Sequence, residues 1–429
     1  MNPASEITAC VVDNGVFPHV ARRLARDFET VYYWSPQERA FPTIRDCCIG
    51  DGFDGVERVD SPWRVKDQCD LFVFPDIGFS AMQAELISQG RVVWGARGGD
   101  SLEINRGKFL GALEEAGLPV AKHEIIKGIT NLRLFLKDKG DKFIKMSRFR
   151  GDFETFHWRD WGQDESALDA YAVRFGPLKE QATFYVFDPI DTDIEDGVDA
   201  YCIDGLWPET VIHGFENKDK SYLGTFQKFS DLPEEVRKVN EAFGPILAEY
   251  EYRSMFSTEV RITKEGESFF IDPTCRFGSP PSQVQCEMIE NLGEIIWAGA
   301  NGRLVEPKPA AKFGVQALIK VDRSDWAVMD IPDEIDQWVK FAFSCKSDGR
   351  TCIPPDEQGV SEIGWLVAVG DTIEEAVSNL REHKEQLPDG VCCEFNSLSD
   401  LLKEVKEAED KGMEFTDQPV PEPAIVLED

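Results

Sequence analysis

Residues 259–283, EVRITKEGESFFIDPTCRFGSPPSQ, form the stretch that decides the fold. Residues 260–263 alternate apolar and polar side chains, and residues 268–271 are rich in aromatic and β-branched side chains, so each segment predicts a short β-strand. The polar residues between them include Gly266, which favours a turn. We therefore predict a β-hairpin at this position.

Two acidic side chains flank the predicted hairpin. Glu259 opens the first strand and Asp272 closes the second, thirteen positions later. In the matching register their carboxylates can share a cation, and two carboxylates plus phosphate oxygens are a usual ligand set for Mg²⁺. Asp272, Thr274 and Arg276 alternate along an extended segment and are therefore expected to face one site. The alternative is that both acids are solvated charges paired with arginines such as Arg261.

The composition indicates a multidomain protein with ordinary cores. A chain of 429 residues with 42% hydrophobic residues is long enough for two or three domains. It has no apolar run of the ~18 residues that a membrane helix needs, and its start lacks the pattern of a signal peptide, so we expect a cytoplasmic protein without a membrane contact. The cysteines, including the adjacent pairs at 47–48 and 392–393, lack the spacing of a zinc site and are expected to be reduced.

The net charge of −33 limits the partners of the protein. Nucleic-acid binding requires clustered lysine and arginine side chains on the phosphates, so general nucleic-acid binding is not expected. Any anionic substrate must instead meet a local group of basic residues.

The first hundred residues alternate predicted strands with predicted helices. Strands are predicted at 7–13, 31–34, 70–75 and 91–95, and helices at 20–28 and 80–89. This alternation predicts a parallel α/β sheet, which binds ligands at the carboxyl ends of its strands. The candidate residues at those ends are Asn14, Gly15, Asp76, Ile77 and Gly78. The segment lacks G-x-G-x-x-G, so no NAD site is expected.

The next segment contains two lysines within predicted elements. Lys108 lies in a helix predicted at 100–116. Lys145 ends a strand predicted at 142–146 and leads into a glycine-containing loop with Arg148 and Arg150. Such a loop can cover a phosphate, and the alternative is a solvated surface loop.

The rest of the chain also mixes strands and helices. Strands are predicted at 183–190, 199–203, 313–321 and 365–369, and helices at 234–252, 283–300 and 372–385. Residues 410–429 are charged and then rich in proline, which predicts a mobile tail.

Together these features resemble the ATP-grasp superfamily and, within it, the phosphoribosylamine-glycine ligase family. The acids of the hairpin and Thr274 resemble the superfamily pattern of an acidic residue followed some thirteen positions later by E-x-N. Residues 274–283, TCRFGSPPSQ, are similar to the family pattern N-x-R-F-G-D-P-E-x-Q. Residues 101–123 and 364–395 are similar to the family's lysine-bearing helix and to its small C-terminal domain.

The resemblance implies an α/β protein with an ATP-grasp fold that binds ATP with Mg²⁺, or Mn²⁺ in its place. The implied domains are a parallel α/β domain at 1–105, an ATP-grasp domain at 106–305 with a lid at about 122–190, a small α+β domain at 306–409 and the tail at 410–429. The implied site residues are Lys108 and Lys145 on the ATP phosphates, Asp188, Pro189 and Ile190 at the adenine, Asp199 at the ribose, Glu259, Asp272 and Thr274 at the metal, and Arg276 as the catalytic residue on the substrate carboxylate.

The implied activity is that of an ATP-dependent carboxylate–amine ligase, which forms an amide through an acyl phosphate and releases ADP and phosphate. Its partners would be a small carboxylate and a small amine. Residues 14–19 replace the family's G-G-R-E-H-A, and residues 221–226 replace its T-G-G-M-G loop, which implies a changed substrate. The alternatives are phosphoribosylamine-glycine ligase itself and a non-catalytic nucleotide-binding regulator, the latter favoured by Thr274 and Asp199.

Overall fold

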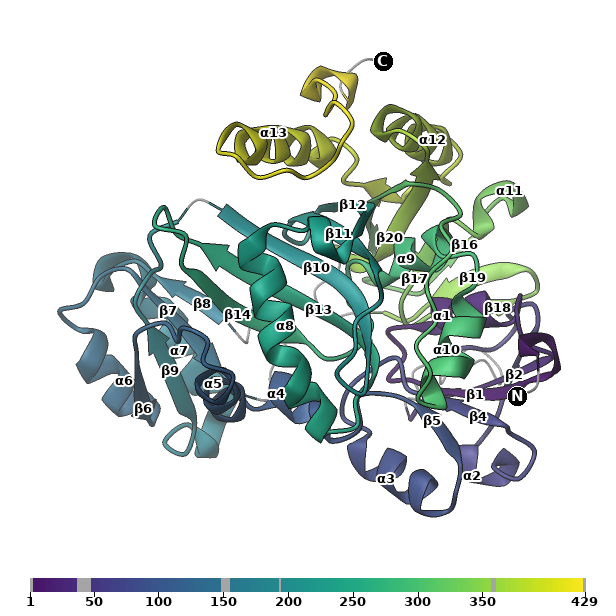
Figure 1. Cartoon of the computed structure of the whole chain (residues 1–429), viewed down its shortest axis with the longest axis horizontal. Helices are drawn as coiled ribbons and strands as arrows, with labels where there is room; N and C mark the ends of the chain where they lie inside the picture. The colour runs from purple at the N-terminus through teal and green to yellow at the C-terminus, as the bar shows by residue number, and fades with distance from the viewer. Residues whose placement is uncertain (1–2, 37–47, 148–154, 193, 356–359, 427–429) are drawn as a thin grey trace.

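The computed structural model describes residues 3–36, 48–147, 155–192, 194–355 and 360–426 (Figure 1). The predicted loop with Arg148 and Arg150 lies outside these ranges. One parallel sheet and three antiparallel sheets make a mixed α/β structure, which confirms the predicted fold class. No helix within the described ranges is both long enough and apolar enough to cross a bilayer.

The N-terminal sheet has five parallel strands in the order β3-β2-β1-β4-β5. The strands are β1 (Thr8–Val12), β2 (Thr30–Trp34), β3 (Val56–Arg58), β4 (Leu71–Val73) and β5 (Val92–Trp94), and the helices are α1 (Pro18–Leu24), α2 (Pro62–Val65) and α3 (Ser80–Ser88). Ala9 and Val11 of β1 join one core, and Cys10 and Val12 join another. Because both faces of the sheet are covered, the inner strands β1 and β4 are almost entirely apolar, as buried parallel strands usually are.

A break in the next helix decides which basic side chain reaches the middle of the molecule. The sequence predicts one helix at 100–116, but the structure has two, α4 (Asp100–Ile104) and α5 (Arg106–Glu115). Asn105 between them is extended, and its side chain accepts a hydrogen bond from the Lys108 amide at 3.2 Å, which caps α5. As a result Arg106 is buried and Lys108 is exposed.

A separate four-stranded antiparallel sheet lies at one end of the molecule (Figure 1). Its strands are β6 (His123–Lys127), β9 (Thr183–Phe187), β7 (Lys142–Met146) and β8 (Thr155–Trp158), in that order, and its helices are α6 (Ile129–Leu136) and α7 (Trp161–Phe175). Leu132, Trp158, Leu168 and Phe184 belong to its own apolar core.

A nine-stranded antiparallel sheet runs through the rest of the chain. The main order is β14-β13-β10-β11-β12-β15-β20-β17, and β21 pairs with β15. The strands are β10 (Ile194–Ile203), β11 (Thr210–Asn217), β12 (Ser221–Lys228), β13 (Arg253–Ile262), β14 (Ser268–Thr274), β15 (Phe313–Asp322), β17 (Val339–Phe341), β20 (Val360–Gly370) and β21 (Cys392–Cys393). The predicted hairpin is therefore present as β13 and β14, and β14 forms one edge of this sheet.

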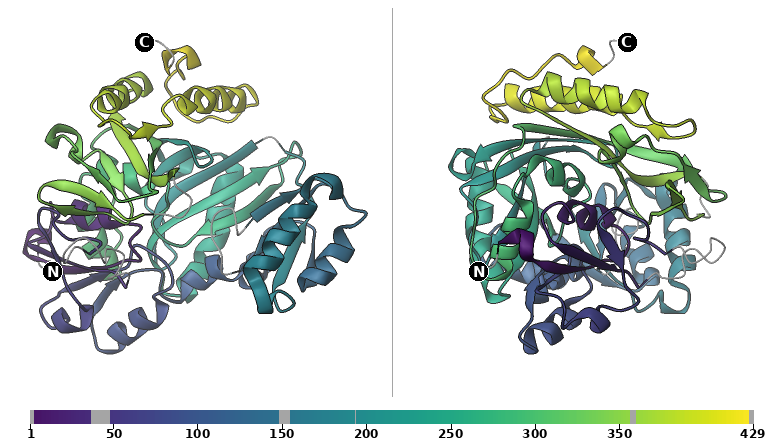
Figure 2. Two further views of the ribbon diagram at one scale, coloured as in Figure 1. Left: turned by 180° about the vertical axis from the view of Figure 1, so that it is seen from behind. Right: turned by 90° about the vertical axis from the view of Figure 1, so that its right-hand side faces the viewer.

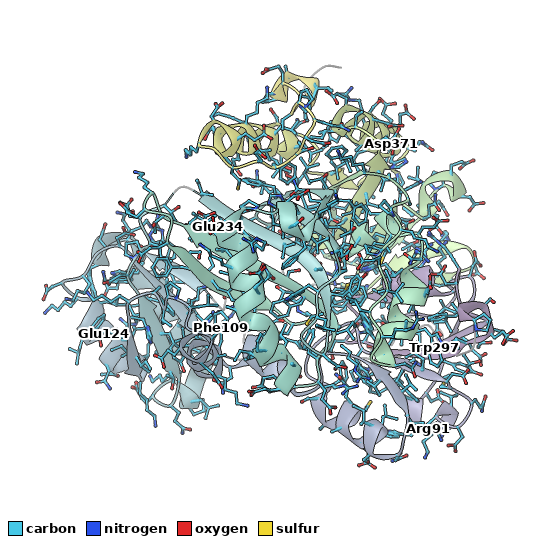
Figure 3. All side chains as sticks on the ribbon, in the orientation of Figure 1. Arg91, Phe109, Glu124, Glu234, Trp297 and Asp371 are labelled. Atoms are coloured by element: carbon cyan, nitrogen blue, oxygen red, sulfur yellow. The ribbon has the colours of Figure 1, made fainter. Side chains whose placement is uncertain are left out.

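Helices cover the nine-stranded sheet at several places. They are α8 (Glu234–Glu249), α9 (Ser282–Met288), α10 (Leu292–Ala300), α12 (Ile373–Glu385) and α13 (Ser397–Asp410). Phe109 of α5, labelled in Figure 3, joins three elements. Its ring packs against those of Phe243 of α8 and Phe270 of β14, with ring centroids 6.1 and 5.0 Å apart. A small sheet of β16 (Ala327–Met329), β19 (Arg350–Ile353) and β18 (Cys345–Ser347) and the short helix α11 (Asp333–Asp336) complete the structure.

The C-terminal segment packs on the molecule. Figure 2 shows α12 and α13 on the same side, away from the N-terminal sheet. Met413, Phe415, Val420 and Val426 are buried in the C-terminal core, and the Gln227 side chain donates a hydrogen bond to the Phe415 carbonyl. These apolar side chains anchor the segment up to residue 426, in contrast to the mobile tail that its charge and proline content predict.

Candidate functional site

The two acids of the hairpin lie directly opposite each other. Glu259 on β13 pairs with Asp272 on β14, and a β-bulge follows Glu259. Burial, the neighbouring charges of Glu195 and Asp272, and a hydrogen bond with Glu195 raise the pKa of Glu259 well above its usual range. Glu259 and Asp272 therefore lie close together, as the sequence predicts. Their carboxylates are close enough that negative charge on both is unfavourable.

Two cations hold Asp272 in its charged form. Arg106 and Lys145 each form an ion pair with a different oxygen of its carboxylate. Burial alone would raise the pKa of Asp272, but the charges of Arg106 and Lys145 lower it well below its usual value. Arg106 also donates to the Ile271 carbonyl at 2.8 Å and is only 3% exposed. Lys145 thus lies beside the acidic pair, and its contact with ATP phosphates stays a prediction; Arg106 was not predicted.

An apolar pocket of about 140 Å³ opens beside this ion-pair cluster. It lies between the four-stranded sheet and the hairpin. Its apolar lining comes from Phe109, Leu110, Leu113, Ala121, Phe143, Phe187, Ile190 and Phe270. Its polar end holds Arg106, Lys145, Lys218, Glu259 and Asp272. Apolar walls with a few converging polar groups are the usual lining of a ligand pocket.

Asp188 and Ile190 line this pocket, and the predicted contact of the segment 188–190 with adenine stays a prediction. Asp188 accepts from Lys122 at 3.0 Å and from Lys142 at 3.1 Å, and these hydrogen bonds lower its pKa. Pro189 is exposed and lines neither of the cavities described in this section.

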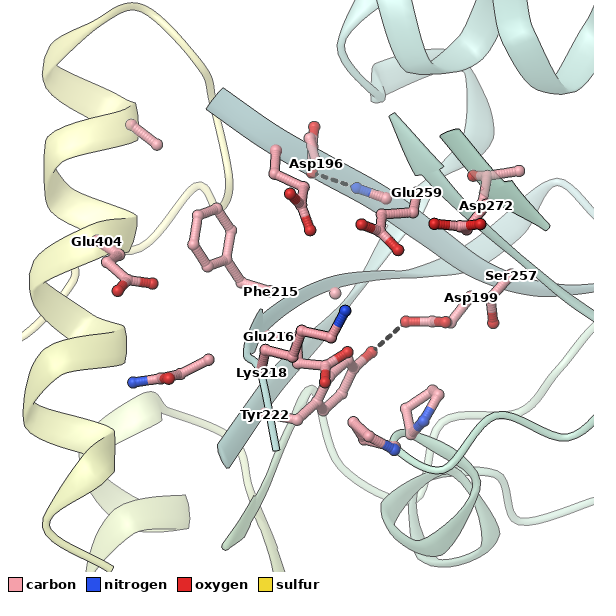
Figure 4. Close-up of a pocket in the computed structure, with 18 of the residues that line it drawn as sticks. Asp196, Asp199, Phe215, Glu216, Lys218, Tyr222, Ser257, Glu259, Asp272 and Glu404 are labelled. Atoms are coloured by element: carbon pink, nitrogen blue, oxygen red, sulfur yellow. Dashed lines mark hydrogen bonds between the residues drawn. The ribbon is translucent and has the colours of Figure 1, made fainter. Parts of the chain in front are cut away.

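A second, polar cavity of about 480 Å³ lies on the other side of the acidic pair (Figure 4). It shares Lys218, Glu259, Arg261 and Asp272 with the apolar pocket. Its acidic lining residues are Glu195, Asp196, Asp199, Glu216, Glu259, Asp272, Glu404 and Glu407, and its basic ones are Lys218, Arg261 and Lys411. The two cavities therefore meet at Glu259 and Asp272. Helix α13 supplies Glu404 and Glu407, which no local sequence pattern connects with the hairpin.

Asp199 and Thr274 lie on the wall of the polar cavity and not on that of the apolar pocket. Asp199 is buried and accepts a hydrogen bond from the Tyr222 hydroxyl at 2.6 Å. Burial raises the pKa of Asp199. Its contact with a ribose stays a prediction, as does the metal contact of Thr274.

Arg276 lies outside both cavities, at the carboxyl edge of the N-terminal sheet. Its Nε donates to Glu103 at 2.8 Å and lies 3.8 Å from Asp76. Asn14 donates to the same Asp76 carboxylate at 3.0 Å, so the structure brings together the predicted candidate residues Asn14 and Asp76. Arg276 therefore faces the N-terminal sheet, and its role on a substrate carboxylate stays a prediction.

Lys108 does not reach the acidic pair. Lys108 is exposed on α5 and lines neither cavity. Arg106, at the start of the same helix, lines the apolar pocket. Arg106 could have been predicted from its position directly after Asn105, because asparagine favours the start of a helix.

The acidic pair suits a cation that is shared with a ligand. No group of three or more histidine, cysteine, aspartate or glutamate side chains with metal-binding geometry occurs among the described residues. Mg²⁺, however, usually takes only one or two carboxylates and completes its shell with substrate phosphates and water. Glu259 and Asp272 could hold such an ion, and a cation at this point would offset the burial and the neighbouring negative charges that raise the pKa of Glu259.

Comparison with known proteins identifies the architecture. No protein-family model matches the sequence, and no curated protein matches it. Among solved structures, phosphoribosylamine-glycine ligase from Thermotoga maritima aligns with a TM-score of 0.67 at 15% identity, over 90% of this chain and 99% of that one. L-amino acid ligase from Bacillus licheniformis aligns with a TM-score of 0.58 at 16% identity, over 90% and 99%.

A third structure has the same fold and holds ligands. The biotin carboxylase domain of 2-oxoglutarate carboxylase from Hydrogenobacter thermophilus, in complex with MgADP, ADP and bicarbonate, aligns with a TM-score of 0.61 at 13% identity, over 98% of this chain and 99% of that one. The chain thus has the ATP-grasp fold. This confirms the resemblance to ATP-grasp proteins, including phosphoribosylamine-glycine ligase, at the level of the fold.

Proposed function

We propose that this protein is an ATP-dependent carboxylate–amine ligase. The observation that carries the proposal is the meeting of an apolar pocket and a polar cavity at one acidic pair, Glu259 and Asp272. A ligase of this kind needs a nucleotide on one side of the transferred phosphoryl group and its acceptors on the other. The ligase structures with the same fold support this reading.

The apolar pocket is proposed to take the adenine, and its polar end the phosphates. Phe143, Phe187 and Ile190 offer flat apolar surface, and Asp188 lies at the rim. Arg106 and Lys145 converge on Asp272, so phosphate oxygens that enter here would replace the carboxylate as partner of at least one of them. Positive charge on transferring phosphoryl groups is a principal source of catalysis in such reactions.

Glu259 and Asp272 would hold Mg²⁺, or Mn²⁺ in its place. When bound, such an ion supplies charge neutralisation between the phosphate oxygens. Lys218 lies close to both acids: burial would lower the pKa of its ammonium, but the charges of Glu259 and Asp272 raise it. This lysine is therefore charged and can orient a third phosphate oxygen.

The proposed reaction proceeds in two steps that balance. An oxygen of the carboxylate substrate attacks the γ-phosphorus of ATP, which forms an acyl phosphate and releases ADP. The nitrogen of a neutral amine then attacks the acyl carbon; the C–N bond forms, the bond from carbon to the phosphate oxygen breaks, and phosphate leaves with the electron pair and one proton of the amine. Since acyl phosphates hydrolyse, the cavity must exclude water while the intermediate exists.

The experiment that tests this proposal traps the acyl phosphate. The protein is incubated with ATP, Mg²⁺, hydroxylamine and one carboxylate at a time from a panel of amino acids and small organic acids, and both ADP and hydroxamate are measured. We expect ADP and hydroxamate in equal amounts with at least one carboxylate. Asp272→Asn should abolish both, and Glu265→Gln, an exposed acid in the turn of the same hairpin, should not.

The regulator alternative predicts a different outcome of the same experiment. If ATP binds, no carboxylate supports ADP release and Asp272→Asn changes nucleotide affinity alone, the protein is a nucleotide-binding regulator. The melting temperature of Asp272→Asn is the control, because a large fall would indicate a structural role of the ion-pair cluster.

A further inference from the structure

A row of four rings crosses the four-stranded sheet beside the apolar pocket. His123 of β6, Phe187 of β9, Phe143 of β7 and His157 of β8 lie directly opposite one another on neighbouring strands. Residues two positions apart on a strand share a face of the sheet, so the row lies on the same face as Lys145. The two phenylalanines line the pocket together with Lys145, and the two histidines lie at the ends of the row. This face of the sheet therefore faces the proposed nucleotide site.

The rings of Phe143 and His157 are closely stacked. Their centroids lie 4.5 Å apart and their planes differ by only 4°. At the other end of the row, the rings of Phe187 and His123 lie 5.2 Å apart and are tilted by 35°. Stacked aromatic rings attract each other, and the imidazole covers one face of Phe143. Because Phe143 is only half-buried, the stacked imidazole restricts a ring that the core alone does not enclose.

The imidazole of His157 is itself held in place. Its Nε2 donates a hydrogen bond to Asp141 Oδ1 at 2.8 Å, since a carboxylate can only accept. Asp141 has a φ of 51°, and its amide donates to the Arg159 carbonyl at 2.9 Å. The Trp158 indole donates to the Lys139 carbonyl at 2.9 Å. Strand β8 and the turn before β7 thus hold each other, and the orientation of the imidazole is fixed.

This arrangement is expected to add little to the stability of the fold. The side chains of His157 and Asp141 are 45% and 64% exposed. Ion pairs between exposed side chains contribute little to the free energy of unfolding. The main consequence of the contact is therefore the orientation of Phe143 at the wall of the pocket.

We propose that His157 is a positioning residue for the base of the nucleotide. It holds the Phe143 ring in the orientation in which that ring contacts the base, and Asp141 fixes the imidazole behind it. His157 does not contact the base and acts through Phe143 alone. This inference rests on the proposed function, in which the apolar pocket takes the adenine.

The test is a double-mutant cycle in the full-length protein. Calorimetric titration with β,γ-imido-ATP (imido-ATP) and Mg²⁺ measures the nucleotide affinity of the wild type, His157→Ala, Phe143→Ala and the double variant. We expect His157→Ala to weaken binding about fivefold, the effect of one aromatic pair. In the Phe143→Ala background the same change should have no further effect, because the ring through which His157 acts is absent.

A conservative variant and a control complete the test. His157→Phe keeps a flat ring for stacking and should bind imido-ATP within about twofold of the wild type. The melting temperature of His157→Ala should change little, because the side chain is half exposed. The matched control is Val173→Ala, a change at a residue of α7 that is 81% exposed. It should bind imido-ATP as the wild type does.

The possible results separate the claims. Unchanged affinity in His157→Ala or in Phe143→Ala would overturn the inference. So would an equal loss from His157→Ala with and without Phe143, or a loss in His157→Phe as large as that in His157→Ala. A large fall in the melting temperature of His157→Ala would assign the residue to the stability of the sheet and also overturn it. Failure of imido-ATP to bind the wild-type protein is a separate result, which would overturn the proposed ligase function and this inference with it.

Discussion

Arg106 and Asp272, 166 positions apart in the chain, form an ion pair between the start of α5 and the edge strand β14. Arg106 also contacts the carbonyl of Ile271, so one guanidinium fixes both the backbone and the carboxylate of the strand. The pair joins the apolar pocket to the acidic end of the polar cavity. It is thus the contact on which the geometry of the proposed phosphate site depends.

Replacement of Arg106 should disrupt nucleotide binding more than replacement of Lys108. We expect Arg106→Gln to weaken imido-ATP binding about 100-fold, because a hydrogen bond from the guanidinium to a charged phosphate oxygen is worth up to about 3 kcal/mol. Lys108→Gln removes an exposed charge two residues away and should change the affinity by less than about twofold. Calorimetry and melting temperature measure both variants.

Arg106→Lys refines this test. The lysine keeps the charge but cannot contact Asp272 and the Ile271 carbonyl at once, so its effect should lie between those of the wild type and Arg106→Gln. A larger loss with Lys108→Gln than with Arg106→Gln would show that the helix presents its other face to the nucleotide.

The contrast between these two residues shows why the sequence predicted only part of the site. Glu259 and Asp272 were predictable because a hairpin is local, and its register follows from the strand pattern. Lys108 follows from the resemblance of residues 101–123 to a lysine-bearing helix, which does not say which face of the helix meets the site. A helix turns by about 100° per residue, so Lys108 points about 200° away from Arg106. Glu404 reaches the polar cavity only through the packing of α13 on the sheet, which no local pattern encodes.

Nucleotide binding should depend on Mg²⁺ through Glu259. In wild-type protein, chelation of Mg²⁺ with EDTA should weaken imido-ATP binding about tenfold or more, since the ion joins the carboxylates to the phosphates. Glu259→Gln should remove most of this dependence. Titrations with and without Mg²⁺ measure the effect, and Glu265→Gln should behave as the wild type. A Glu259→Gln variant with full Mg²⁺ dependence would place the ion elsewhere.

The apolar pocket should contribute to nucleotide affinity through Ile190. Ile190→Ala is expected to weaken imido-ATP binding about tenfold, because the loss of apolar contact of this size is worth about 1.5 kcal/mol. The side chain is only half-buried, so the melting temperature should change little. Leu134→Ala, a change at an exposed residue of α6, is the control. A large fall in the melting temperature of Ile190→Ala, with nucleotide affinity unchanged, would assign Ile190 to the core.

Stability should fall between about pH 4 and pH 7 because of Asp13. Burial, with the charge of Asp76, raises the pKa of Asp13 from 3.8 to about 7. The folded protein therefore holds a proton that the unfolded chain releases, so the free energy of unfolding decreases as the pH rises through this window. Asp13→Asn removes the titration and should leave the protein more stable than the wild type at pH 8 by a few kcal/mol.

Thermal unfolding of both proteins at pH 5 and pH 8 measures this effect. The Phe17 amide and the Tyr33 hydroxyl donate to Asp13 Oδ2, and an asparagine oxygen can accept both hydrogen bonds. Melting temperatures that rise from pH 5 to pH 8 in the wild type but not in Asp13→Asn would show that the carboxylate is stabilised in its charged form.

The transfer of an oxygen atom tests the central claim most directly. A carboxylate that supports hydroxamate formation is labelled with ¹⁸O in its carboxyl group and incubated with ATP, Mg²⁺ and hydroxylamine. The released phosphate is then examined by ³¹P NMR. An acyl phosphate carries one carboxylate oxygen into phosphate, so we predict one ¹⁸O atom per phosphate released. Phosphate released without label would contradict the proposed mechanism.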